Sequence, residues 1–166
     1  MEELQLYAIN LFQCEPGFQT GKRVLPSQYL LYVHRGTGRF KIGSEVHEAK
    51  AGDCFYCPPG VGNSIYAEQE DPFLLSGIEF YAGSGSGQMS GIAEKTNLFA
   101  QSFLRDMILE MVEEYQYGKT NSMELCNHLL AVLVERIRRD FQNRSSKSSS
   151  VARQLLFSLS FSPSLF

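Results

Sequence analysis

Glycines and prolines interrupt residues 36–80 at the spacing of a small β-barrel, and no other feature of the chain constrains its fold as strongly. Glycine permits the positive φ angles of hairpin corners, and Pro58-Pro59 cannot continue a central strand. The stretches between these residues are rich in β-branched and aromatic side chains, as strands are. Four such strands are predicted, at Tyr29–His34, Arg39–Ile42, Asp53–Cys57 and Leu74–Phe80.

Two stretches with helical periodicity follow the predicted strands, at about residues 97–117 and 121–142. Asn97 is the expected N-cap of the first stretch. The second stretch begins at Asn121, and Glu124 three residues later completes a capping-box pattern. The predicted fold class is therefore mainly β with C-terminal α structure: a barrel followed by two antiparallel helices.

The second helical stretch is apolar over too much of its circumference for a single buried stripe. One apolar row consists of Cys126, Leu130, Leu133 and Ile137. A neighbouring row consists of Leu125, Leu129 and Val132, with Arg136 at its end. This neighbouring row either contacts a second copy of the chain, in a homodimer, or packs against the first helix within one monomer.

Changes in composition divide the chain into three regions. Residues 1–82 form an N-terminal arm and the barrel, residues 83–142 form the helical pair, and residues 143–166 form a serine-rich linker with an atypical tail. Glycine and serine alternate within residues 82–87, which predicts a flexible joint. Residues 144–150 have the composition of a disordered polar linker.

The overall composition argues against several classes of protein. A hydrophobic content of 43% and a charged content of 20% are those of a globular domain. The net charge of −3 argues against nucleic-acid binding by this chain alone, because such proteins carry a basic face. The chain opens on Met1-Glu2-Glu3 rather than on a basic leader, and no apolar run has the length of a membrane span. We therefore expect a cytoplasmic protein with no membrane partner.

Residues for metal binding or covalent catalysis do not come together in the sequence. The histidines are His34, His47 and His128, and none belongs to an H-x-H or H-E-x-x-H pattern. Glu45 and His47 would share one face of a strand, which a solvated edge strand explains better than a metal site. No nucleophile motif lies at a strand-to-helix turn. The sequence thus predicts no catalytic residue, no metal and no cofactor.

Cys54 and Cys57 form a C-x-x-C pair, a spacing used by zinc sites and by redox sites. A structural zinc site needs four ligands, and the chain has no second pair at a matching spacing. Residues three apart on a strand also point to opposite faces. We therefore expect these cysteines to be small apolar side chains of a strand.

The interior of the predicted barrel is the remaining candidate site. Small-molecule pockets combine mostly apolar walls with a few polar groups. The expected wall residues are Tyr29, Leu31, Phe40, Phe55 and Ile65. Small barrels can also be filled by their own side chains, so a ligand-binding interior and a packed core both stay open.

Residues 29–42, 51–53, 58–60 and 78–80 together resemble the N-terminal domain of AraC-type transcriptional regulators. The resemblance covers roughly residues 20–142, and it consists of the glycine spacing, the Gly-Asp turn, the double proline and the closing aromatic residue. It implies a cupin barrel (a double-stranded β-helix) that binds a small-molecule effector, followed by helices that dimerise the protein. In this family, a C-terminal pair of helix-turn-helix units binds DNA.

The resemblance also implies roles for single positions. Arg23 matches a recurrent family arginine, whose forked donors suit an anionic or hydroxyl-rich effector. Asn63 stands where family members commonly carry a histidine, which keeps a polar contact and disfavours a metal. Ile65, Leu75 and Gly77 stand where sugar-sensing members have polar contacts, which favours a more apolar effector.

At its C-terminal end the chain departs from the family pattern, because residues 151–156 resemble the opening of the first DNA-binding helix and the pattern then ends. We expect an effector-sensing domain that forms a homodimer, has no catalytic activity and contacts DNA only through a helix-turn-helix region absent from this chain. The effector would bias the docking of the arm, residues 1 to about 20. Two alternatives stay open: a metal-dependent cupin enzyme, either an isomerase or a dioxygenase, and a structural dimerisation module with a filled barrel.

Overall fold

Two antiparallel sheets form the barrel in the computed structural model, which describes residues 3–83 and 87–160. The first, here called the shared sheet, has the strand order β1 (Gln5–Ile9), β9 (Leu74–Tyr81), β4 (Gln28–Arg35), β7 (Asp53–Cys57) and β10 (Lys95–Asn97), and β9 also pairs with β2 (Phe12–Gln13). The second, here called the outer sheet, has the order β3 (Arg23–Val24), β8 (Gly62–Ala67), β5 (Thr37–Ile42) and β6 (Glu45–Lys50). The four predicted strands are confirmed as β4, β5, β7 and β9.

Glycines with positive φ angles form the corners between neighbouring strands, as the sequence predicts. Gly43 (φ 58°) connects β5 and β6, which pair without interruption from Thr37 opposite Lys50 to Ile42 opposite Glu45. Gly52 (φ 89°) connects β6 and β7. A Cβ atom at Gly52 would lie 2.5 Å from the Cβ atom of Phe99, so this corner also lets the segment before the helices approach the barrel.

Both faces of the shared sheet are buried, and they belong to two different hydrophobic clusters. Along β4, Tyr29, Leu31 and Val33 belong to the cluster inside the barrel. The alternating residues Leu30 and Tyr32 belong to the cluster between the sheet and the helices. Because side chains alternate along a strand, one strand contributes to both clusters. This double burial explains why the central residues of β4, 29–33, are all apolar or aromatic.

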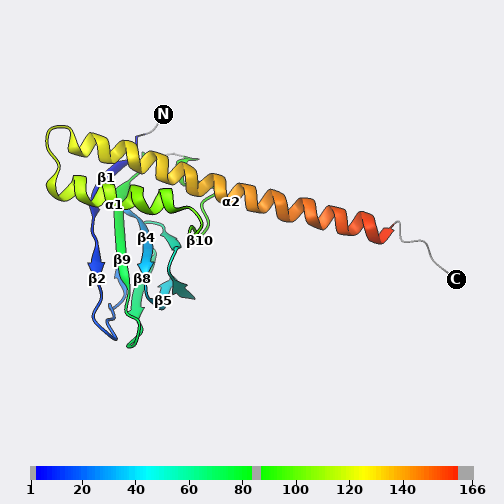
Figure 1. Cartoon of the computed structure of the whole chain (residues 1–166), viewed down its shortest axis with the longest axis horizontal. Coiled ribbons are helices and arrows are strands. Elements are labelled where there is room, and N and C mark those ends of the chain that lie inside the picture. Colours follow the sequence, from blue (N-terminus) through cyan, green and yellow to red (C-terminus); the bar gives the residue numbers. More distant parts are fainter. Residues whose placement is uncertain (1–2, 84–86, 161–166) are drawn as a thin grey trace.

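Two antiparallel helices, α1 (Ser102–Tyr117) and α2 (Ser122–Ser160), cover the face of the shared sheet that points away from the barrel (Figure 1). The short 3₁₀ turn η1 (Gly87–Met89) and β10 lead from the barrel to α1. Gln101, which immediately precedes α1, donates a hydrogen bond of 3.0 Å to the Asp140 side chain, near the middle of α2. The predicted barrel followed by an antiparallel helical pair is therefore confirmed.

The predicted start of the first helix is wrong, because Asn97 ends β10 and α1 begins only at Ser102. The side-chain oxygen of Asn97 does accept a hydrogen bond from the backbone N–H of Phe99 (3.1 Å), as a capping residue would. Its amide nitrogen, however, donates to Asp53 of β7 (2.9 Å), and the backbone of β10 pairs with β7. Sheet pairing therefore holds Asn97 in the strand, and α1 begins five residues later, after a turn at residues 98–101.

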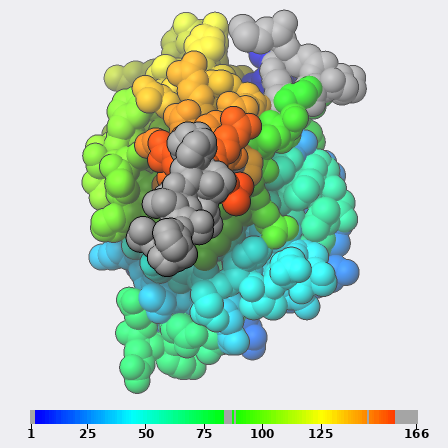
Figure 2. All heavy atoms as spheres, turned by 90° about the vertical axis from the view of Figure 1, so that its right-hand side faces the viewer, coloured from blue at the N-terminus to red at the C-terminus, as the bar shows by residue number. Residues whose placement is uncertain are grey.

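The predicted end of the second helix is also wrong. Residues 144–150, expected to be a disordered linker, continue α2, which ends at Ser160. No glycine or proline occurs between Ser122 and Ser160. Relative to alanine, serine lowers helix stability by only about 0.5 kcal/mol per residue. The last turns project beyond the body of the protein, and they face the viewer in Figure 2. Among the described residues, no helix combines the length and the apolar character needed to cross a membrane.

The two apolar rows of α2 differ in burial. The row of Cys126, Leu130, Leu133 and Ile137 is fully buried against α1 and the shared sheet. In the neighbouring row, Leu125 is 41% exposed and Val132 is 43% exposed, whereas Leu129 is half-buried. Burial against α1 within one monomer, one of the two interpretations of this row, is therefore wrong for Leu125 and Val132.

His34 lies in β4 beneath the helical pair, where it is partly buried. Its Nε2 atom lies 2.8 Å from the hydroxyl of Ser76, which is buried in β9. Its ring packs edge-on against Tyr32, with the centroids 4.8 Å apart. Burial, followed by the positive charges of Arg105 and Arg35, lowers the pKa of His34 from 6.5 to about 4. The folded protein therefore holds this ring neutral.

We predict that His34 makes the protein less stable as the pH falls from about 6.5 towards 4. The folded state binds this proton less tightly than the unfolded chain, so its contribution to stability is complete above the unfolded pKa and decreases below it. Urea unfolding at pH 7.5, 6 and 5 should show a shallower pH dependence for His34→Gln than for the wild type. The control is His128→Gln, at an exposed position of α2. Equal slopes for His34→Gln and the wild type would contradict this account.

Candidate functional site

The predicted wall residues come together inside the barrel. Tyr29 and Leu31 extend from β4, Phe40 from β5 and Phe55 from β7, and all four are at most 5% exposed. Ile65 of β8 and Leu75 of β9 belong to the same cluster, so both sheets contribute to it. The interior is therefore a continuous apolar environment, as the alternation along the strands predicts.

Aromatic rings form the centre of this interior. The ring centroids of Phe40 and Phe55 are 5.2 Å apart, and those of Tyr29 and Phe40 are 6.5 Å apart. The ring of His47, from β6, lies 5.6 Å from that of Phe55. Such tilted arrangements add to the stabilisation that burial provides. These rings connect the outer sheet to the shared sheet at the centre of the interior.

One end of the interior is polar, and its central pair is Arg23 and Asn63, which face each other across β3 and β8. The Nε and Nη2 atoms of Arg23 both donate to the side-chain oxygen of Asn63, at 3.2 and 2.7 Å. The guanidinium also lies over the ring of Tyr29, 5.3 Å from its centroid. Asn63 is only 2% exposed, and its amide nitrogen lies 3.8 Å from the sulfur of Cys57. Asn63 and Tyr29 therefore fix the position of Arg23.

Gly77 of β9 faces Tyr29 within the barrel. A Cβ atom at Gly77 would lie 2.6 Å from the phenolic oxygen of Tyr29, so any larger residue would displace that ring. Burial raises the pKa of Tyr29, and the charge of Arg23 opposes this effect. The phenol is therefore neutral at physiological pH. The close approach between Tyr29 and Gly77 could not be predicted, because 48 residues of sequence separate the two positions.

Glu79 was not assigned a role from the sequence. It alternates along β9 with Ile78 and Phe80, which face the helices, so it lies on the barrel side. Its Oε2 atom accepts a hydrogen bond of 3.4 Å from Ser27. Glu79 also affects the pKa of Tyr29, in the direction opposite to Arg23. The polar end of the barrel therefore carries one positive and one negative group.

The other polar candidates are dispersed. His34 lies beneath the helices, His47 pairs with Glu94 at 2.7 Å and His128 is exposed on α2. Within residues 3–83 and 87–160, histidine, cysteine, aspartate and glutamate side chains form no group of three or more that could hold a metal. Cys54 faces the helices and Cys57 the barrel, so the prediction of opposed, buried cysteines is confirmed.

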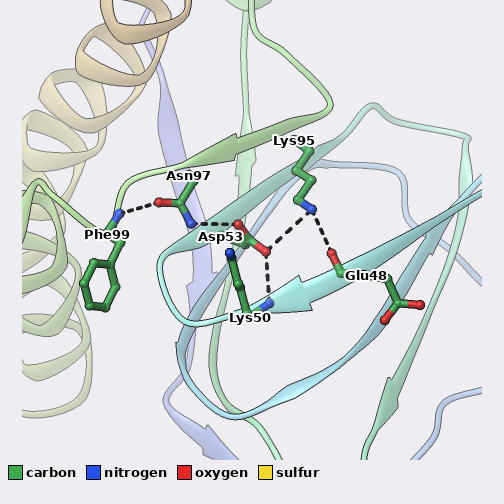
Figure 3. Close-up of polar contacts among 6 residues, drawn as sticks. All are labelled: Glu48, Lys50, Asp53, Lys95, Asn97 and Phe99. Carbon is green, nitrogen blue, oxygen red and sulfur yellow. Dashed lines mark hydrogen bonds and ion pairs between the residues drawn. The ribbon is translucent and has the colours of Figure 1, made fainter.

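The Gly-Asp turn joins the barrel to the helical pair, as Figure 3 shows. Asp53 is 1% exposed and accepts hydrogen bonds of 2.9 Å from the Lys50 backbone N–H and the Asn97 side chain. Lys95 lies 3.8 Å from Asp53 and donates to the backbone oxygen of Glu48 at 2.9 Å. The carboxylate of Asp53 thus connects the corner between β6 and β7 to β10, which leads into α1.

The four candidate dimerisation residues lie on α2, and the exposed ones share a surface with α1. The guanidinium of Arg136 lies 5.7 Å from the ring centroid of Phe103, which is itself exposed on α1. Leu125 and Val132 are exposed on α2. A groove of about 850 Å³ lies between residues 3–4, which precede β1, and α2, and Leu4, Val132 and Arg136 are among its lining residues.

Comparisons with known proteins identify the family. A family model described as the AraC-like ligand binding domain matches residues 7–159. No curated protein gives a significant match. Among solved structures, an RmlC-like cupin from Shewanella frigidimarina has a TM-score of 0.41 at 18% identity, over 46% of this chain and 66% of that chain. A cupin protein from Bacteroides fragilis has a TM-score of 0.41 at 23% identity, over 52% of this chain and 73% of that chain.

A salicylate 1,2-dioxygenase from Pseudaminobacter salicylatoxidans has a TM-score of 0.41 at 23% identity, over 46% of this chain. The alignment covers only 21% of the dioxygenase chain. The family match, in contrast, includes the barrel, α1 and most of α2. This chain belongs to the AraC-like ligand-binding domain family.

Proposed function

We propose that this chain is the effector-sensing and dimerisation domain of an AraC-like transcriptional regulator and that it is not an enzyme. A small-molecule effector binds inside the barrel (residues 1–82), and the helical pair (residues 83–142) forms a homodimer. In this proposal, DNA contact belongs to a helix-turn-helix region outside this chain. The observation that carries the proposal is an apolar cluster inside the barrel with an oriented cation, Arg23, at its polar end.

The composition of the interior supports ligand binding. Ligand sites have predominantly apolar and aromatic walls and a small number of fixed polar groups. Here the walls come from Leu31, Phe40, Phe55 and their neighbours, and the polar groups are concentrated at one end. Arg23 is oriented before any ligand binds, which lowers the entropic cost of binding.

The position of the N-terminal arm supports coupling between the barrel and the helices. Strand β1 pairs with β9 of the shared sheet, and the Leu6 backbone N–H donates to the Asn127 side chain of α2 at 2.7 Å. Leu4 and Leu6 are buried in the cluster beneath the helices. An effector that binds the barrel with the arm docked more tightly than with the arm released would shift the population of the two states.

The effector proposal predicts that a small molecule raises the melting temperature of this protein, because a ligand that binds only the folded state stabilises it. A broad metabolite set is screened by thermal shift, and hits are repeated on Ile65→Phe, which adds volume inside the barrel. The matched control is Val46→Phe on the exposed face of β6. Ile65→Phe should weaken the stabilisation at least about tenfold in ligand concentration, whereas Val46→Phe should keep it.

Two results would contradict the effector proposal. A dimer that no compound stabilises would support a structural module with a filled barrel. Stoichiometric transition metal in the purified protein, together with turnover of a substrate, would support the cupin isomerase or dioxygenase alternative.

The dimerisation proposal predicts that Val132→Arg converts a dimer into a monomer, because it places a charge in an apolar contact without an opposite partner. Light scattering should then report half the wild-type mass. Val132 is a better test position than Leu129, which is half-buried against the helix cluster and whose change would also disturb folding. The control Val46→Arg should leave the mass unchanged. A persistent Val132→Arg dimer would place the contact on another surface.

A further inference from the structure

We infer that the effector is a monoanion: a single carboxylate on an apolar body, with the carboxylate bound by Arg23. This inference depends on the proposed function, because it assigns a chemical class to the ligand of the same barrel.

Within the described residues Arg23 makes no direct ion pair, although Glu79 lies at the same end of the barrel. Asn63 accepts hydrogen bonds from two nitrogens of the guanidinium, but an amide oxygen carries no formal charge. No carboxylate lies within 4 Å of Arg23 in the part of the chain that the structure describes. An aspartate at position 63 would orient the guanidinium equally well and would neutralise it. The neutral amide of Asn63 therefore orients the guanidinium of Arg23 without neutralising its charge.

The surroundings of Arg23 strengthen its attraction for a ligand carboxylate. The guanidinium lies at the end of the apolar interior, over the ring of Tyr29, which is 5% exposed. Charge pairs are stronger where bulk water is partly excluded. Arg23 itself is half-buried, and its Nη1 nitrogen makes no hydrogen bond within the described residues. A ligand carboxylate at this nitrogen would supply the missing partner.

The remaining residues limit the rest of the ligand. Ile65, Leu75 and Gly77 offer no side-chain hydrogen bond to a hydroxyl-rich molecule, and Phe40 and Phe55 provide apolar surface. Arg23 can pair directly with one carboxylate, whereas a second carboxylate would have no cation here and would face the negative charge of Glu79. These constraints favour one carboxylate and an apolar or aromatic body over a sugar or a dicarboxylate.

Matched pairs of a carboxylate and its primary amide test this inference. Benzoate and benzamide, phenylacetate and phenylacetamide, and hexanoate and hexanamide are compared by thermal shift and titration calorimetry. The wild type should prefer at least one acid over its amide by about tenfold to a hundredfold, the range expected for a charge-assisted hydrogen bond. Asn63→Asp, which is isosteric, should abolish the preference because it neutralises Arg23 internally.

The matched control is Ser64→Asp, the next residue of β8, which alternates with the buried Asn63 and Ile65. It adds the same charge to the same strand on the opposite face, so it should keep the preference for the acid. Circular dichroism of all variants verifies that they are folded.

Three results would overturn the inference. The first is equal binding of acid and amide. The second is binding of neutral compounds, sensitive to Ile65→Phe, with no binding of any acid. The third is an Asn63→Asp variant that keeps the wild-type preference. Each of these results leaves the effector proposal in place. If no acid, amide or metabolite binds the folded protein, the effector proposal and this inference are both wrong.

Discussion

The burial of the shared sheet on both faces is the constraint on which the rest of the structure depends. Each central strand must supply apolar side chains to the barrel and, at alternating positions, to the helical pair. Tyr29 and Leu31 fill the barrel, and Leu30 lies beneath the helices. Any change in the spacing or tilt of these strands therefore affects both clusters. The sheet is the physical connection between the candidate ligand site and the candidate dimer surface.

Local sequence was sufficient to predict the elements whose signals agree with their tertiary environment. The strands between the glycine corners are found where β-branched and aromatic residues predicted them, because the positive φ angles at Gly43 and Gly52 are a local property of glycine. Asn97 carries a valid capping signal, but pairing between β10 and β7 and the bond to Asp53 hold it extended. The composition of residues 144–150 predicted a disordered linker, but this serine-rich segment has no glycine or proline and continues α2 to Ser160.

The candidate site was predictable in part. Alternation identified the apolar wall, and the family resemblance identified Arg23 and Asn63 as separate positions. Their direct contact could not be predicted, because it depends on the pairing of β3 with β8 across 40 residues. The same holds for Gly77, whose lack of a side chain leaves room for the Tyr29 ring. These long-range contacts supply the features from which the charge of the effector was inferred.

The central claim is that the barrel and the helical pair form one cooperative unit through the shared sheet. Native-state hydrogen exchange of Phe40→Leu tests it most directly, because Phe40 lies in the outer sheet and belongs only to the barrel cluster. This substitution should cost about 1 kcal/mol. The account predicts faster exchange in α1, around Ile108, as well as in β5 and β8. Faster exchange confined to β5 and β8, with α1 unchanged, would contradict it.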